Sequence, residues 1–229
     1  MDYRENNKAT QKYHFPLPFI DQVLDTLVGK KFFSFLDGFI GYNQIQIAPE
    51  DQDKTTFTFP WGTFAYRVLP FGLCNAPATF QRAILEIFSD LVNDSVEIYM
   101  DDFTPYGNSI EEELDNLEKV FKRCKQTHLS LNIENCHMMM QEGIVLGHFI
   151  SVAGIQVDLA KVEVIHNFPT PKTQKEVCSF IGYVGYYCRF VEYFFKIASL
   201  LFLILTKDAK FNWSDACNIT LIELTKLVS

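Results

Sequence analysis

Residues 96–106, V-E-I-Y-M-D-D-F-T-P-Y, are the stretch that decides how this chain is interpreted. Apolar runs at residues 96–100 and 103–106 flank Asp101 and Asp102, and two strand-like runs around a two-residue turn predict a β-hairpin. Such a turn usually contains Gly or Asn, because its backbone needs positive φ. Two adjacent carboxylates also repel each other, so a bound divalent cation would explain them. A solvated turn is the alternative, because Asp is common in turns.

A third carboxylate, Asp37, ends the apolar run F-S-F-L-D of residues 33–37 and is followed by Gly38. Taken alone, an Asp at a strand end is more often a turn-former than a ligand. A strand end is nevertheless a rigid support, and metal sites are built on rigid elements. Combined with Asp101 and Asp102, it predicts a site for nucleotidyl transfer in which carboxylates from two segments hold Mg²⁺. The spacing leaves open whether the three converge.

Composition indicates a folded protein with a bulky core. The 229 residues are 48% hydrophobic and 15% aromatic, which is enough for one or two domains. The six cysteines form no C-x-x-C pair, so we expect reduced thiols in an intracellular protein and no zinc site. The polar N-terminus shows no secretory signal, and the apolar run at residues 197–205 predicts a buried helix, being too short to cross a bilayer. The net charge of −8 does not favour binding to a phosphate backbone.

The order of predicted elements favours an α+β fold with a mostly antiparallel sheet, followed by a small helical domain. Helices are predicted at residues 20–27, after a cap at Asn75, after a cap at Asn108 or Ser109, and again from residue 158 onward. Strands are predicted at residues 32–36, 41–47, 55–59, 63–69, 129–133, 138–140 and 144–150.

Seven segments, taken in chain order, carry a resemblance to one protein family. They are D-Y-R with N-K-A-T (residues 2–10), F-S-F-L-D-G-F-I-G-Y-N-Q-I (33–45), L-P-F-G-L-C-N-A-P-A-T-F-Q (69–81), Y-M-D-D (99–102), V-L-G-H-F-I (145–150), G-Y-V-G-Y-Y-C-R-F (182–190) and F-N-W (211–213). The series resembles the reverse transcriptase of gypsy-type LTR retrotransposons, most closely the Athila-like elements of plants. Chance matches to Y-x-D-D are common, whereas the whole series in order is not.

The resemblance implies a right-hand polymerase fold. It has an α+β palm with an antiparallel sheet and helices, partial fingers and a small, mostly helical thumb. Fingers and palm would occupy residues 1–152, and the thumb with the start of a connecting region residues 153–229. The implied activity is RNA-directed DNA polymerisation, a nucleotidyl transfer of dNTP to a primer 3′-hydroxyl with two Mg²⁺ ions, or Mn²⁺ as the alternative.

The resemblance also implies partners and a location. The partners are an RNA or DNA template with its primer, dNTP, and ribonuclease H, integrase and other segments of a retrotransposon polyprotein, with no membrane. The implied location is intracellular, either in a cytoplasmic virus-like particle or in the nucleus.

Residue roles follow from the same resemblance. Catalysis and metal binding are assigned to Asp37, Asp101 and Asp102. Substrate binding is assigned to Tyr42, Phe71, Gly72 and Arg4, and the primer grip to Leu146, Gly147 and His148. Tyr42 stands where the family places a ring beneath the incoming sugar, so that no 2′-hydroxyl fits. Gly72 permits close approach of the backbone to substrate. For Tyr42 and Phe71, simple core packing is the alternative.

Several positions depart from the family pattern. Asn6 replaces Leu, Asn135 replaces a Lys that can donate a proton to pyrophosphate, Val68 and Cys188 replace Arg, and Ser199 replaces Pro. The chain also starts at D-Y-R, without the family's basic fingers segment, and ends before any ribonuclease H region. These departures favour an alternative, a weak or inactive remnant that keeps the fold as a nucleic-acid or protein binding module. A metal-dependent nuclease or phosphatase is a further alternative, but it does not explain residues 69–81.

Overall fold

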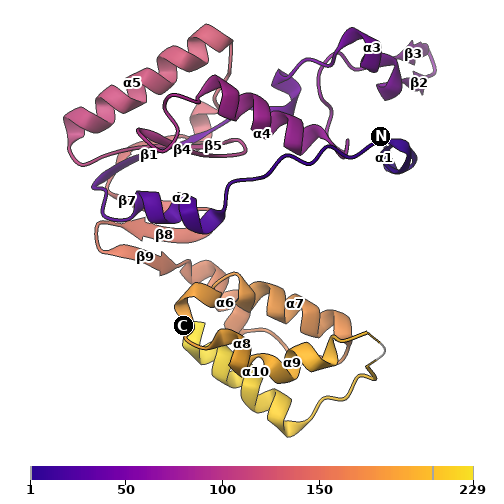
Figure 1. Cartoon of the computed structure of the whole chain (residues 1–229), viewed down its shortest axis with the longest axis vertical. Coiled ribbons are helices and arrows are strands. Elements are labelled where there is room, and N and C mark those ends of the chain that lie inside the picture. The colour runs from indigo at the N-terminus through magenta and orange to yellow at the C-terminus, as the bar shows by residue number, and fades with distance from the viewer. Residues whose placement is uncertain (1, 208, 229) are drawn as a thin grey trace. The chain divides into compact units, whose positions relative to one another are not determined.

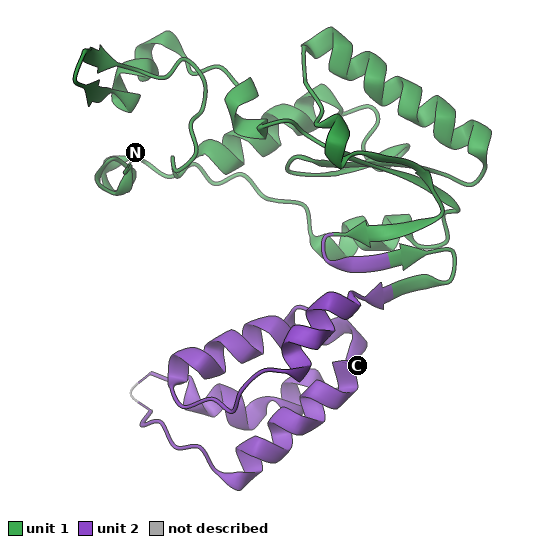
Figure 2. Ribbon diagram, turned by 180° about the vertical axis from the view of Figure 1, so that it is seen from behind, with its two compact units in different colours: residues 1–145, 150–155 green, residues 146–149, 156–229 purple. Residues whose placement is uncertain are grey.

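The computed structural model describes residues 2–207 and 209–228. The chain divides into two compact units, residues 1–145 with 150–155 and residues 146–149 with 156–229 (Figure 2). Among the described residues, no helix has both the length and the apolar composition that crossing a membrane requires. The boundary predicted after residue 152 concerns functional domains and stays a prediction.

The first unit is built on a four-stranded antiparallel sheet. Its strands are β1 (Phe32–Asp37), β4 (Val96–Tyr99), β5 (Asp102–Gly107) and β6 (His137–Met140), in the order β4-β5-β1-β6. β1 pairs antiparallel with both β5 and β6, and β4 pairs antiparallel with β5. The strand predicted at residues 32–36 is confirmed, and its Phe33 and Leu36 side chains are buried. The antiparallel α+β architecture is therefore as predicted.

Three helices cover this sheet, namely α2 (Ile20–Leu27), α4 (Ala76–Ile87) and α5 (Ile110–Thr127). Figure 1 shows α4 and α5 on one face of the sheet and α2 on the other. The main core lies between the sheet, α4 and α5, and its buried side chains are Leu36, Phe80, Ile84, Phe88, Leu91, Val96, Ile98, Phe103, Leu117, Val120 and Cys124. All three helices are where the apolar periodicity predicted them.

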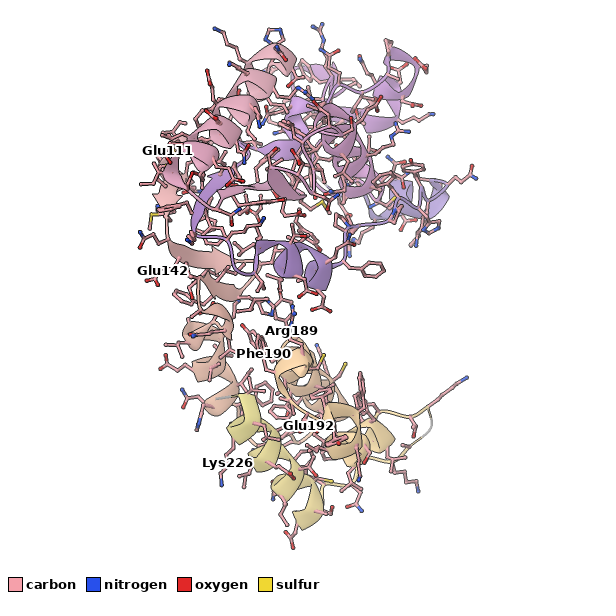
Figure 3. All side chains as sticks on the ribbon, turned by 60° about the vertical axis from the view of Figure 1, so that its left-hand side comes forward. Glu111, Glu142, Arg189, Phe190, Glu192 and Lys226 are labelled. Carbon is pink, nitrogen blue, oxygen red and sulfur yellow. The ribbon has the colours of Figure 1, made fainter. Side chains whose placement is uncertain are left out.

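The start of α5 carries a full set of capping interactions. The Ser109 side chain accepts a hydrogen bond from the backbone N–H of Glu112. In return the Glu112 carboxylate accepts one from the backbone N–H of Asn108 at 2.8 Å, which completes a capping box. Glu111 lies in the same first turn (Figure 3), where the helix dipole favours a negative charge. The predicted cap at Ser109 is confirmed.

The start of α4 is only partly as predicted. Asn75 occupies the N-cap position, but its side chain makes no capping hydrogen bond. Its Oδ1 accepts from the backbone N–H of Tyr13, and its Nδ2 donates to the Gln11 carbonyl. Asn75 is thus the N-cap residue as predicted, but its amide binds the extended N-terminal segment instead of the first N–H groups of the helix.

The rest of the first unit consists of short elements. They are α1 (Arg4–Ala9), η1 (Gly41–Gln44), α3 (Pro49–Gln52), η2 (Asp53–Thr55), the hairpin β2 (Phe57–Phe59) and β3 (Gly62–Phe64), and η3 (Ile133–Asn135). The strand predicted at residues 41–47 is wrong, since η1 begins there after Ile40 turns to a φ of 47°. The strand predicted at residues 129–133 is also wrong, because it is reduced to a single bridge between Leu131 and Gly38.

A three-stranded sheet has the order β7-β8-β9, formed by β7 (Glu142–Val145), β8 (His148–Ser151) and β9 (Gly154–Val157). The single strand predicted at residues 144–150 is therefore divided. Leu146 and Gly147 interrupt it with φ angles of 46° and 68°, which belong to a tight turn rather than to extended backbone.

The second unit is helical. Its elements are α6 (Leu159–His166), α7 (Gln174–Gly185), η4 (Cys188–Phe190), α8 (Phe194–Ile197), α9 (Ser199–Ile204) and α10 (Asp215–Val228). Their apolar faces enclose one core, in which Phe180, Tyr187 and Leu201 are almost fully buried. The buried helix predicted at residues 197–205 is only partly correct, because α8 ends at Ile197 and Leu203 is 62% exposed.

Candidate active site

The hairpin that carries the two adjacent carboxylates is present, but its turn is shifted by one residue. Tyr99 and Asp102 are paired residues of β4 and β5, so the turn consists of Met100 and Asp101. Met100 adopts a φ of 57°, which is uncommon for a residue with a long side chain. Its backbone N–H donates to Oε1 of the buried Gln81 at 2.7 Å. This hydrogen bond from α4 helps to hold the strained turn in place.

The β1–β5 pairing brings the third carboxylate to the same place. Asp37 is the direct partner of Asp102 in the sheet. Just beyond the strand end, the backbone N–H of Gly38 donates to the carbonyl of Asp101 at 2.8 Å. A Cβ on Gly38 would lie 3.3 Å from both the Cβ and the carbonyl oxygen of Asp101. A glycine after Asp37 therefore allows the turn to pack tightly against the end of β1.

Two asparagine amides hold the Asp37 carboxylate. Nδ2 of Asn135 donates to Oδ2 of Asp37 at 2.8 Å, and Nδ2 of Asn132 donates to the same oxygen at 3.3 Å. The backbone N–H of Asn132 also donates to the Asp37 carbonyl at 2.8 Å. The segment around η3 thus fixes both the main chain and the side chain of Asp37.

Negative charge is concentrated at this point. Asp102 is exposed as a whole residue, but the pKa of its carboxyl is raised to about 6. Desolvation by the surrounding chain is the largest cause, and repulsion from Asp101 and Asp37 adds to it. The ion pairs found among the described residues involve none of these three carboxylates. A cation bound here would relieve the repulsion.

The donor set fits Mg²⁺ with substrate, though not a closed protein cage. Among residues 2–207 and 209–228, no three acidic, histidine or cysteine side chains are arranged to hold a metal by themselves. Mg²⁺ sites are usually completed by substrate phosphates and water around one or two carboxylates. The arrangement of Asp37, Asp101 and Asp102 is compatible with that type of site.

Aromatic rings lie beside the carboxylates. The ring of Tyr42 in η1 packs 5.1 Å from that of Phe71 and 5.5 Å from that of Phe80, which is buried in the core. Burial, and then the negative charge of Asp101, raise the pKa of Tyr42. Phe71 is 61% exposed, so the Tyr42–Phe71 pair has a core side and a solvent side. Simple core packing therefore does not describe Phe71.

The N-terminal segment contacts the loop that contains Gly72. This glycine has a φ of 99°, and a Cβ on it would lie 3.3 Å from Cδ2 of Tyr3. Nδ2 of Asn7 donates to the Gly72 carbonyl at 2.7 Å, and its Oδ1 accepts from the backbone N–H of Cys74. Arg4 lies outside these contacts, because its guanidinium pairs with the Asp2 carboxylate at the surface.

The residues predicted to grip the primer, Leu146, Gly147 and His148, belong to the second compact unit. His148 is buried, and its Nδ1 lies 2.9 Å from the carbonyl oxygen of Leu146. Its ring packs against those of Tyr186, Tyr187 and Phe190.

The sequence and the fold of this chain are both similar to those of known proteins. Residues 1–184 match the family described as reverse transcriptase (RNA-dependent DNA polymerase). The chain belongs to the reverse transcriptase family. The fold also matches foamy viral protease-reverse transcriptase in complex with double-stranded DNA, with a TM-score of 0.89 and 25% identity over 99% of this chain and 40% of that one. The same viral enzyme with an RNA/DNA hybrid matches with a TM-score of 0.85 and 24% identity, covering 99% and 31% of the two chains. The predicted polymerase palm fold is confirmed.

Curated relatives of this reverse transcriptase chain are retrotransposon polyproteins. It is 36% identical over 224 residues to the retrovirus-related Pol polyprotein from transposon 412 of Drosophila melanogaster, covering 98% of this chain and 18% of that protein. It is 34% identical over 210 residues to the corresponding polyprotein from transposon 297 of the same fly, covering 92% and 20%. A Schizosaccharomyces pombe relative, the transposon Tf2-3 polyprotein, is 29% identical over 93% of this chain and 16% of its own length. The chain thus spans about a fifth or less of the length of these relatives.

Sequence reasoning missed the residues that support the three carboxylates and the loop at Gly72. The resemblance includes Asn7 and Gln81 only as letters of its motifs, assigns no role to Asn132, and marks Asn135 only as the loss of a proton donor. A polar amide among the apolar side chains of a helix face, as at Gln81 in the middle of α4, is a signal that could have found one of them. Asn132 lies in a loop, where asparagine is common and carries no signal, and Asn7 and Asn135 lie in the short helices α1 and η3.

Proposed function

We propose that this chain is an RNA-directed DNA polymerase that adds dNTPs to a primer 3′-hydroxyl on an RNA or DNA template. The observation that carries the proposal is the direct pairing of Asp37 with Asp102 in the sheet. The carbonyl of Asp101 also accepts a hydrogen bond from the backbone N–H of Gly38, directly after β1. Membership of the reverse transcriptase family and the likeness to a viral enzyme in complex with RNA/DNA hybrid support it.

The three carboxylates would hold two Mg²⁺ ions, with Mn²⁺ as the alternative. When bound, such ions lower the pKa of the attacking hydroxyl and neutralise charge that develops on the phosphorus oxygens. The chain's own contribution is to fix the ligands. Asn132 and Asn135 orient Asp37, while Gln81 holds the turn that presents Asp101. Rigid ligands of this kind need no reorganisation when charge develops.

The aromatic pair and Gly72 would receive the nucleotide. The solvent side of Phe71 offers a surface for the dNTP, and Tyr42 beside it would occupy the space that a 2′-hydroxyl requires. Gly72, with its positive φ and no side chain, allows the backbone to approach the substrate closely. Arg4, paired with Asp2, would support the fingers segment rather than contact the nucleotide.

The primer would be held by Leu146, Gly147 and His148. In functional terms, residues 1–152 would form fingers and palm, and residues 153–229 the thumb and the start of a connecting region. A gypsy-type retrotransposon, with Athila-like motifs, would supply the polyprotein, together with ribonuclease H and integrase as partners. Its place of action would be inside the cell, in a virus-like particle or in the nucleus.

Primer extension on an RNA template with Mg²⁺ tests the proposal. The wild-type chain is compared with the double variant Asp101→Asn, Asp102→Asn and with Asp115→Asn, which changes an exposed carboxylate on α5. We expect extension by the wild type and by Asp115→Asn, and a loss of at least about 100-fold in the double variant, because the charges that stabilise the transition state are removed. Absence of extension by a folded wild-type chain would refute the proposal.

A second candidate function, an inactive nucleic-acid or protein binding module, is favoured by one observation. The amide of Asn135, where the family has Lys, bonds to Asp37 and cannot donate a proton as an acid. Binding of primer–template without any extension, by wild type and double variant alike, would select this candidate.

A further inference from the structure

The turn between β7 and β8 has a strained backbone. Leu146 and Gly147 follow each other with φ angles of 46° and 68°. The left-handed region costs a leucine about 1–2 kcal/mol, so its surroundings must stabilise this conformation. Non-glycine residues held in this region cluster at ligand sites, where the strain sets a particular geometry.

Two tyrosine hydroxyls from the end of α7 hold this turn. The hydroxyl of Tyr186 donates to the carbonyl of Leu146, and the hydroxyl of Tyr187 donates to the carbonyl of Gly147 at 2.8 Å. Tyr187 is 1% exposed, and burial raises its pKa to about 12, so its hydroxyl keeps its proton and water cannot replace it. The two neighbouring carbonyls of the turn thus each accept a hydrogen bond from one of two neighbouring tyrosines.

His148 joins the same cluster. Its ring centroid lies 5.1 Å from that of Tyr186, 5.3 Å from that of Tyr187 and 5.9 Å from that of Phe190. Phe190 is in turn paired with the guanidinium of Arg189 at 6.0 Å, and both side chains are labelled in Figure 3. These rings restrict the rotamers of both tyrosines, so the hydroxyls are fixed in direction.

The turn and the first tyrosine are also in van der Waals contact. A Cβ on Gly147 would lie 3.4 Å from Cε1 and 3.7 Å from the hydroxyl oxygen of Tyr186. A side chain at position 147 would therefore press on Tyr186 as well as strain its own backbone.

We infer that Tyr186 and Tyr187 are positioning residues for the primer grip, whose hydroxyls lock the turn at Leu146 and Gly147 in the form that holds the primer end. The inference rests on the proposed function, which assigns the primer grip to residues 146–148. It adds that the grip is held in place by two hydroxyls from the segment that directly follows α7.

The test removes the hydroxyls and leaves the rings. Tyr186→Phe, Tyr187→Phe and the double variant are compared with wild type and with Tyr183→Phe, an exposed tyrosine on α7 whose ring packs 6.0 Å from that of Phe168. The readouts are the Kd for a primer–template labelled at the primer 3′ end, the KM for dNTP, and the Tm. We expect the Kd to rise about 5-fold for each lost hydroxyl. The KM for dNTP should be unchanged, because the nucleotide is assigned to residues of the other unit.

Gly147→Ala is a second variant that keeps both hydroxyls and strains the turn itself. It should raise the same Kd, even if a tyrosine variant fails to fold. If the wild type neither binds nor extends a primer, the proposed function fails. If the wild type extends primers and the two tyrosine variants bind as tightly as Tyr183→Phe, the inference is overturned and the proposed function stands. A lower Tm with an unchanged Kd would equally overturn it, because the hydroxyls would then only stabilise the fold.

Discussion

Asp37 is the residue at which most contacts of the site meet. Its main chain pairs with Asp102, its carbonyl accepts a hydrogen bond from Asn132, and its carboxylate accepts from the amides of Asn132 and Asn135. Amide donors orient a carboxylate without neutralising it. Asp37 is therefore fixed in direction, and none of the ion pairs among the described residues includes it.

The amide of Asn135 can be tested by truncation. Asn135→Ala should raise the Mg²⁺ concentration needed for half-maximal primer extension by about 10-fold, because a hydrogen bond to a charged group is worth roughly 1.5–3 kcal/mol. Titration of extension rate against Mg²⁺ measures this, with Asn212→Ala, an exposed asparagine of the second unit, as the control. An unchanged Mg²⁺ requirement would show that the amide does not position Asp37.

The ring of Tyr42 should control sugar selection. It is packed between Phe71 and Phe80, so shortening it opens space beside the carboxylates without removing its neighbours. Tyr42→Val should raise the use of ribonucleotides relative to deoxynucleotides by at least about 10-fold, since the steric clash with a 2′-hydroxyl is lost. The measurement is the ratio of kcat/KM for matched rNTP and dNTP. An unchanged ratio would show that the Tyr42 ring has no part in sugar selection and only packs in the core.

Among the helices and strands, the sequence predicts those with a regular spacing of apolar residues. It does not predict where the backbone takes a strained conformation. Ile20–Leu27, Phe32–Asp37 and Ile110–Thr127 form as predicted, because their apolar spacing and caps act within the segment. The hairpin turn lies at Met100 and Asp101, one residue before the predicted position, since Gln81 of α4 supports the positive φ of Met100. A sequence shows neither the partner of such a tertiary hydrogen bond nor the backbone conformation that the bond supports.

The same limit applies to the site. The sequence predicts the strand end at Asp37 and the hairpin at Asp101. The family resemblance then assigns both to one activity, DNA polymerisation. Their pairing register, and the hydrogen bonds from the amides of Asn132 and Asn135 to Asp37, depend on tertiary contacts that no local sequence pattern shows. Residues 41–47 were predicted as a strand, but Gly41 lies in η1, where a Cβ would come within 3.1 Å of the Phe80 ring. Packing overrode the local pattern there.

The contact between α2 and β4 should depend on pH. Glu97 of β4 is 3% exposed, and burial raises its pKa to about 7, a shift that its hydrogen bond from Thr26 of α2 only partly offsets. Since the folded-state pKa lies above the model-peptide value of 4.5, the buried carboxylate costs stability that grows as pH rises from 4.5 to about 7. Glu97→Gln should therefore stabilise the fold at pH 8, by roughly 2–3 kcal/mol, and have little effect near pH 4.5.

Urea unfolding at both pH values measures this difference. Glu142→Gln, which changes an exposed glutamate on β7 (Figure 3), is the matched control. An equal gain at both pH values would contradict the account of Glu97.

The junction of β5 and α5 should tolerate no side chain at Gly107. A Cβ there would lie 2.6 Å from the backbone nitrogen and 3.0 Å from the Cα of Glu113, whose carboxylate accepts a hydrogen bond from the buried Ser34. Gly107→Ala should destabilise the protein by about 2–4 kcal/mol, because backbone atoms must move. Gly182→Ala, with nothing within 4 Å on helix α7, should stabilise it by about 0.5–1 kcal/mol. Thermal unfolding of both variants measures the two changes in stability. Equal changes for Gly107→Ala and Gly182→Ala would contradict the close packing at Gly107.

At the scale of the whole molecule, the proposed roles are divided between two compact units. Nucleotide and metal are assigned to the unit built on the β4-β5-β1-β6 sheet, and the primer grip to the helical unit. The net charge of −8 offers little general attraction for nucleic acid, so binding has to come from particular contacts rather than from the overall field. The carboxylates themselves add to this repulsion until cations are present.

Single-turnover incorporation of one nucleotide tests whether the carboxylate cluster around Asp102 carries out template-directed DNA synthesis. A preformed complex of chain, RNA template and labelled primer is mixed with Mg²⁺ and each dNTP in turn, for wild type, Asp102→Asn and the surface control Asp115→Asn. We expect wild type and Asp115→Asn to add only the dNTP complementary to the template base, and Asp102→Asn to do so at least about 100-fold more slowly. Equal rates for Asp102→Asn and wild type, or incorporation that ignores the template base, would contradict this expectation.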